Sequence, residues 1–184
     1  MHKSDGAMTA PPAEKETAMK SVSLDQMFHD LLRDVYYAER KILRALPKMA
    51  RAAQSQEVKA GFEKHRTETE AQVERLQQVF ELMGKRAQAK TCPAIDGIIE
   101  EGEEVMESYK GSAALDAGLI ASAQAVEHYE MARYGTLCAW AGVLGMTEAV
   151  ELLQATLAEE TATDEALTSL AEASVNEEAA RAAA

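Results

Sequence analysis

Four glutamates stand where long amphipathic helices would be expected to carry apolar side chains. Each lies near the midpoint of an extended helical pattern, on or beside the face that a bundle would bury; they are Glu39, Glu68, Glu127 and Glu160. An ionised carboxylate that is removed from water is strongly destabilising unless it is paired or bound to a metal. Four of them at matching heights in one bundle therefore predict a metal site.

Three further residues extend the predicted ligand set. Glu130 and Asp164 fall on the same faces as two of these glutamates, and His65 lies about one helical turn before Glu68. Carboxylate oxygens with some nitrogen suit iron or manganese, and zinc and magnesium are also compatible with such donors. The alternatives are a surface position for Glu68 and a structural role for His65. Glu130 and Asp164 could instead hydrogen-bond to the ligands, as could Gln72.

Helical patterning predicts an all-α chain. Ser23-Leu24-Asp25-Gln26 has the form of a capping box, and Gly84 and Gly145 are suited to end helices in a left-handed conformation. Thr147 is expected to cap the last long helix. The predicted helices span residues 23–53, 56–84, 94–109, 113–143 and 147–175.

The long helices share one pattern, in which an acidic middle separates two apolar ends. In the first of them the apolar stripe runs through Leu32 and Val35 to Glu39 and resumes at Ile42. The midpoints of antiparallel helices lie at the same level, so carboxylates that are distant in sequence can converge. Weak internal similarity between the two helix pairs fits a two-metal site on a pseudo-twofold axis. We therefore expect an antiparallel four-helix bundle with the shorter helix as a crossover between its halves.

The two ends of the chain are expected to lie outside the bundle. Residues 1–20, which contain Pro11 and Pro12, are expected to form a flexible arm. The bundle would then span residues 21–176, and residues 177–184 are expected to fray.

The composition argues against several other functions. The formal net charge is −12, from 31 acidic and 19 basic residues, and no basic patch with interleaved aromatic residues indicates nucleic-acid binding. The two cysteines, Cys92 and Cys138, are not spaced as in a disulfide framework. No apolar run approaches the ~20 residues that span a bilayer, and residues 1–20 lack the apolar centre of a signal peptide. We expect a soluble, cytoplasmic protein that binds neither membranes nor nucleic acid.

Four stretches of the sequence are similar to a known family. They are Leu31–Glu39, His65–Leu76, Val126–Leu137 and Glu159–Thr168. These stretches resemble the YciE/YciF-type bacterial stress proteins of the ferritin-like superfamily, which also includes rubrerythrins and manganese catalases. The resemblance covers about residues 22–176 and implies a ferritin-like four-helix bundle with a crossover helix, usually a homodimer, linked to stress responses. The sequence departs from the Glu-x-x-His motif of ferritins, because Ala71 and Thr163 stand at the positions of the motif's histidines.

These features together predict a di-metal carboxylate protein of the stress response that holds a pair of iron or manganese ions. Its chemistry would be oxidation of ferrous iron or disproportionation of peroxide, with peroxide or dioxygen as partners and no catalytic residue beyond the metal site. The alternative is a non-catalytic helical stress or interaction protein whose acidic centre is vestigial or structural. The metal content of the purified protein separates the two hypotheses.

Overall fold

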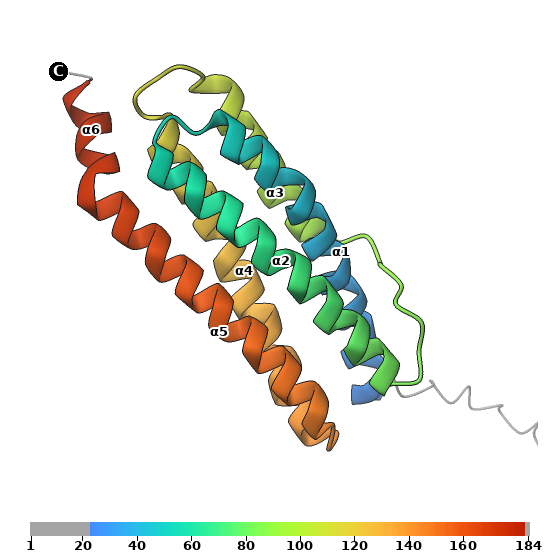
Figure 1. The fold of residues 1–184 in the computed structure, drawn as a ribbon. Helices are drawn as coiled ribbons and strands as arrows, with labels where there is room; N and C mark the ends of the chain where they lie inside the picture. Colours follow the sequence, from blue (N-terminus) through green and yellow to red (C-terminus); the bar gives the residue numbers. More distant parts are fainter. Residues whose placement is uncertain (1–22, 183–184) are drawn as a thin grey trace, which may run out of the picture.

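The computed structural model describes residues 23–182, and these form a bundle of helices (Figure 1). Four helices are long, and they are α1 (Leu24–Ala52), α2 (Gln56–Leu82), α4 (Leu115–Val143) and α5 (Thr147–Leu170). A shorter helix, α3 (Pro93–Ser108), lies in the connection between α2 and α4. The predicted all-α bundle with an added crossover helix is confirmed.

The bundle consists of two antiparallel helix pairs packed side by side. One pair is α1 with α2 and the other is α4 with α5, while α2 contacts α5 and α1 contacts α4 across the bundle (Figure 1). Helix α2 ends at one end of the bundle and α4 begins at the other. The segment that connects them must therefore run the full length of the bundle. It first runs back along α1, where Lys90 N–H donates to the Arg33 carbonyl at 3.1 Å, and then forms α3 against α1 and α4.

Local sequence signals set most helix ends. The Ser23 hydroxyl accepts a hydrogen bond from the backbone in the first turn of α1, as the capping-box pattern predicts. Gly84 and Gly145 follow α2 and α4 with φ of 67° and 72°, a left-handed conformation that costs glycine little. The expectation that Thr147 caps α5 is wrong. Thr147 is the first residue inside the helix, and Met146 precedes it without a side-chain hydrogen bond.

The C-terminal part of the chain stays helical further than expected. After α5 comes a π-helical turn, Ala171–Val175, and then α6, Asn176–Arg181. Val175 is buried in the core, and Arg181 pairs with Glu177 one turn earlier at 2.5 Å. The sequence placed the end of the bundle at residue 176, whereas helix continues to Arg181. The arm predicted for residues 1–20 lies outside the described residues.

A polar layer divides the apolar core into two clusters. One cluster lies at the end of the bundle that α3 covers and includes Phe62, Ile95 and Leu119. The other lies at the end where α1 begins and includes Phe28 and Leu137. The buried polar residues between them are Glu39, His65, Thr69, Gln72, Glu127, Glu130, Thr156, Glu160 and Thr163. The predicted pattern of an acidic middle between two apolar ends is therefore confirmed.

A few large apolar side chains are exposed at the two ends of the bundle. Met27, Leu82 and Val143 are exposed at the end where α1 begins, and Tyr109 is exposed at the other end. Within residues 23–182, no helix combines the length and the apolar character that crossing a membrane requires. The homodimer expected from the sequence stays a prediction.

A buried carboxylate ties the start of α4 to the turn between α1 and α2. Asp116 accepts hydrogen bonds from the backbone N–H groups of Gln54 at 2.8 Å and Ser55 at 2.6 Å. Asp116→Ala leaves both donors without this partner, so we expect the free energy of unfolding in urea to fall by about 1–3 kcal/mol. Asp30→Ala, which removes a partly exposed pair with Arg33 at 3.5 Å, should change the free energy of unfolding by less than about 0.5 kcal/mol. Equal losses in the two variants would contradict the assigned role.

Candidate metal centre

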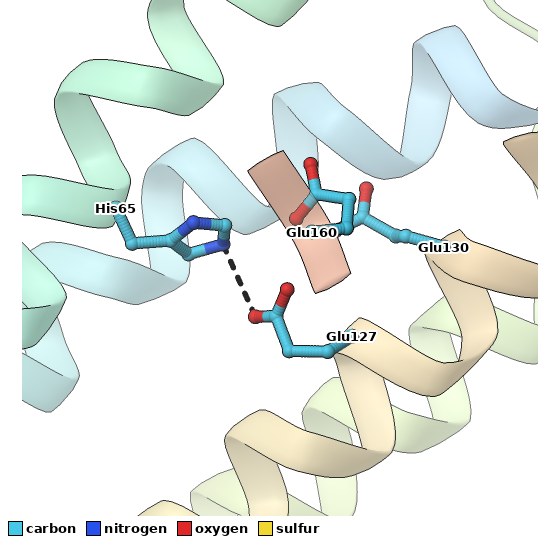
Figure 2. A group of neighbouring side chains, drawn as sticks. All are labelled: His65, Glu127, Glu130 and Glu160. Atoms are coloured by element: carbon cyan, nitrogen blue, oxygen red, sulfur yellow. Dashed lines mark ion pairs between the residues drawn. The ribbon is translucent and has the colours of Figure 1, made fainter. Parts of the chain in front are cut away.

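Four buried side chains from three helices meet at the middle of the bundle. His65 comes from α2, Glu127 and Glu130 from α4, and Glu160 from α5. Each offers one nitrogen or oxygen atom, and these atoms all lie within 4.8 Å of one another. Figure 2 shows the His65 ring facing the three carboxyl groups. Since Glu127 and Glu130 are three residues apart, both point from one face of α4 into the bundle.

Glu39 of α1 adds a fourth carboxyl group to this layer. Its side chain is fully buried, one oxygen accepts a hydrogen bond from the Tyr134 hydroxyl, and the other oxygen is buried without a partner. Burial, and then the charge of Glu160, raises the pKa of Glu39 well above its usual range, so the two carboxyl groups are close enough to interact strongly. All four long helices therefore contribute to the centre.

Most of the polar atoms in this layer lack a hydrogen-bond partner. Both carboxyl oxygens of Glu130 and of Glu160, and one oxygen of Glu127, are buried and unpartnered. His65 Nε2 lies 3.2 Å from Glu127 Oε1, but the orientation is not that of a hydrogen bond, and neither ring nitrogen has a partner (Figure 2). Buried polar groups in folded proteins are nearly always satisfied. Protons shared between neighbouring carboxyl groups, as between Glu127 and Glu160, or a bound cation would satisfy these atoms, and the donor atoms fit a metal ion.

Burial and mutual repulsion disfavour the charged forms of the carboxyl groups. Burial, followed by the adjacent Glu160, raises the pKa of Glu127 to about 11. Burial raises the pKa of Glu160 to about 7 and that of Glu130 well above its usual range. In a site of this kind a proton or a cation must compensate each buried carboxylate. A divalent ion placed among these groups would remove the repulsion between them.

The histidine is already in the form that binds metals. Burial, and secondarily the charge of Lys64, lowers the pKa of His65 to about 4. The ring is therefore neutral near pH 7 and has a lone pair available. One neutral imidazole with four carboxylates is a hard, oxygen-rich donor set that suits iron or manganese.

An ion pair closes one side of the centre between α2 and α5. Arg75 donates two hydrogen bonds to the Glu159 carboxylate, at 2.6 and 2.7 Å, and Gln72 Nε2 donates a third at 3.1 Å. Gln72 is fully buried, and this contact satisfies the nitrogen of its amide group. The sequence indicated Gln72 as a hydrogen-bonding residue but gave no indication of Arg75 or Glu159, because charged residues at such spacing are common on solvated helix faces.

Two predicted ligands lie at the edge of the layer and not within it. Glu68 forms an ion pair with Lys64 on the same helix and keeps one buried oxygen without a partner. Asp164 accepts a hydrogen bond from Gln124 at 3.2 Å and lies 3.3 Å from His128 Nε2. The structure thus brings four of the seven predicted ligands together, places Glu39 close enough to interact with Glu160 and Glu130, and places the other two at the edge of the layer. The seven are Glu39, His65, Glu68, Glu127, Glu130, Glu160 and Asp164.

Comparison with known proteins identifies relatives over most of the chain. Residues 23–180 match the family described as Domain of unknown function (DUF892). The chain is 44% identical over 162 residues to protein YciF of Escherichia coli K12, which covers 88% of this chain and 98% of YciF. The crystal structure of the E. coli stress protein YciF aligns with a TM-score of 0.81 and 45% identity, over 86% of this chain and 99% of that one.

A second solved structure gives the same result. YcfI from Rhodopseudomonas palustris aligns with a TM-score of 0.78 and 43% identity, over 81% of this chain and 96% of that one. The resemblance to the YciE/YciF-type proteins noted from the sequence is confirmed.

The unpartnered carboxyl groups predict an unusual response to mutation in the metal-free protein. Glu130→Gln replaces a buried group that resists ionisation with a neutral one of nearly the same shape. We expect it to raise the free energy of unfolding, measured at pH 7.5 after chelation, by roughly 1–3 kcal/mol. Glu159→Gln should lower it, because Glu159 is paired with Arg75. A loss of stability in both variants would contradict the interpretation that the buried carboxyl group of Glu130 destabilises the metal-free protein.

Proposed function

The chain belongs to the DUF892 family. We propose that it is a di-metal carboxylate protein acting in a stress response. The observation that carries the proposal is the buried layer of unpartnered carboxyl oxygens around a neutral imidazole. The link to stress rests on YciF, a relative that is described as a stress protein.

Five side chains would hold a pair of iron or manganese ions. They are Glu39, His65, Glu127, Glu130 and Glu160. Such ions change oxidation state at accessible potentials, and when bound they would supply the electron transfer needed to oxidise ferrous iron or to disproportionate peroxide. This donor set is close to the carboxylate-rich arrangement found in ferritin-like bundles, with Glu127 and Glu130 supplied by one helix.

The surrounding residues would keep these side chains in place and exclude water. The Tyr134 hydroxyl donates to Glu39, and burial, then the charge of Glu39, raises the pKa of Tyr134 well above its usual value, so this donor stays protonated. Arg75 and Glu159 fix α2 against α5 beside Glu160. The two apolar clusters shield the layer from both ends of the bundle, which strengthens electrostatic interactions inside it.

Metal content is the first prediction of this proposal. Elemental analysis of the purified wild-type protein should find iron or manganese, or the metal should bind on anaerobic loading with ferrous iron. Glu127→Ala should lose at least about 90% of it, because ligand loss weakens binding strongly. Glu70→Ala, a change on the exposed face of α2, serves as the matched control and should retain it. Wild-type protein without metal after loading would support the non-catalytic alternative.

The two candidate reactions give different products, which provides the second prediction. Ferrous iron oxidation should appear as ferric absorbance when dioxygen is admitted, and peroxide disproportionation should appear as oxygen evolution. We expect at least one of the two in the loaded protein, reduced by about tenfold or more in Glu127→Ala and unchanged in Glu70→Ala. Stoichiometric metal with neither reaction would refute the catalytic part of the proposal while leaving metal binding intact.

A further inference from the structure

Two small cavities adjoin the candidate metal centre. The α3-side cavity lies between α1, α3 and α4 and has a volume of about 30 Å³. The α5-side cavity lies between α2, α4 and α5 and has a volume of about 70 Å³. His65, Ala123 and Glu127 line both cavities, so both reach the metal layer beside the same two donor side chains.

Both cavities extend from the metal layer toward solvent. The His65 and Glu127 side chains at the inner end are 4% and 1% exposed. The α3-side cavity is also lined by Glu103, which is about half exposed, and the α5-side cavity by Lys64, which is mostly exposed. Each cavity therefore joins the surface of the bundle to its centre.

The walls of both cavities are mainly apolar. They include Ile42, Leu46 and Ile98 in the α3-side cavity and Phe62, Leu167 and Leu170 in the α5-side cavity. Water, hydrated ions and hydrogen peroxide lose hydrogen bonds in such a space, whereas a small apolar molecule is transferred into it from water favourably. The walls therefore favour an apolar ligand.

The volumes limit the size of that ligand. A cavity holds one water molecule when roughly 10–15 Å³ is available to it. Volumes of about 30 and 70 Å³ therefore suit a molecule of a few atoms and not a larger organic compound. Dioxygen is apolar and diatomic, and it is one of the two oxidants that suit the proposed centre. Size and polarity together match dioxygen.

We propose that these two cavities admit dioxygen to the metal centre and that their apolar walls select it over hydrogen peroxide. The inference rests on the proposed function, because it names the oxidant of the same centre. Of the two candidate reactions it assigns ferrous iron oxidation. Two ferrous ions give up one electron each, and these electrons with two protons reduce one dioxygen molecule to hydrogen peroxide.

One glycine in each wall allows the cavity to be narrowed without changing the metal layer. Gly102 of α3 lines the α3-side cavity, and a methyl group added to it would lie 3.5 Å from Ser122 Cβ. Gly61 of α2 lines the α5-side cavity, and a methyl group there would lie 3.8 Å from Leu170 Cδ1. Both are ordinary contact distances, and alanine is more favourable in a helix than glycine. The double variant Gly61→Ala/Gly102→Ala should therefore fold with smaller cavities.

Xenon binding tests the cavities directly. Crystals of the metal-free wild-type protein are pressurised with xenon, which enters dry apolar cavities, and its anomalous scattering is measured. We expect xenon in both cavities, with an occupancy lowered by about threefold or more in Gly61→Ala/Gly102→Ala. Gly135→Ala is the matched control and should bind xenon like the wild type. Gly135 of α4 lines neither cavity, and its added methyl group would contact no described residue of another helix within 4 Å.

Oxidation kinetics test the route. Protein loaded anaerobically with ferrous iron is mixed with dioxygen in a stopped-flow instrument, and the ferric absorbance is followed. Gly61→Ala/Gly102→Ala should react about threefold or more slowly than the wild type at equal iron content, and Gly135→Ala should react at the wild-type rate. Hydrogen peroxide at the same concentration should oxidise the iron of the wild-type protein at least about tenfold more slowly than dioxygen.

Other outcomes overturn the inference. Cavities without xenon, or a wild-type rate in the double variant despite lower xenon occupancy, would refute the route. Equal slowing in Gly135→Ala would show a general effect of added methyl groups, and a faster reaction with peroxide would refute the selection of dioxygen. If the wild-type protein takes up no iron, the proposed function fails as well, whereas absence of xenon from a protein that takes up iron refutes the inference alone.

Discussion

The burial of four carboxyl groups in one layer of a helical bundle is the constraint on which the rest of the structure depends. Glu39, Glu127, Glu130 and Glu160 cannot all be ionised next to one another in a water-poor interior, and their raised pKa values express that conflict. The layer must therefore hold protons or a cation. The apolar clusters above and below it provide the stabilisation that lets the bundle fold around such a layer.

The connection through α3 allows this layer to be built from all four long helices. With α1 paired to α2 and α4 paired to α5, each helix crosses the middle of the bundle once and can place a side chain there. The Tyr134 hydroxyl donates to Glu39 from within the core, and the Arg75 and Glu159 pair joins α2 to α5 beside the layer. The histidine-poor donor set distinguishes this centre from one built on Glu-x-x-His motifs, and its hard oxygen donors favour iron or manganese over softer metals.

The sequence predicted the helices and the acidic layer well, because both follow from periodicity over long stretches. It was less reliable about which neighbouring residue faces inward. Glu68 was predicted on or beside the inward face and lies at the edge of the layer. Asp164 was predicted on the inward face of its helix but lies at the edge too, while its neighbour Thr163 is buried, because one residue along a helix turns the side chain by about 100°. The Arg75 and Glu159 contact depends on how α2 and α5 are rotated against each other, which no spacing within one helix reveals.

The most direct test of the account is anomalous diffraction from crystals of the wild-type protein loaded with Mn²⁺. We expect strong peaks inside the bundle, between His65 and the carboxyl groups of Glu39, Glu127, Glu130 and Glu160. Manganese found only at surface carboxylates, with the central layer empty of anomalous signal, would contradict it.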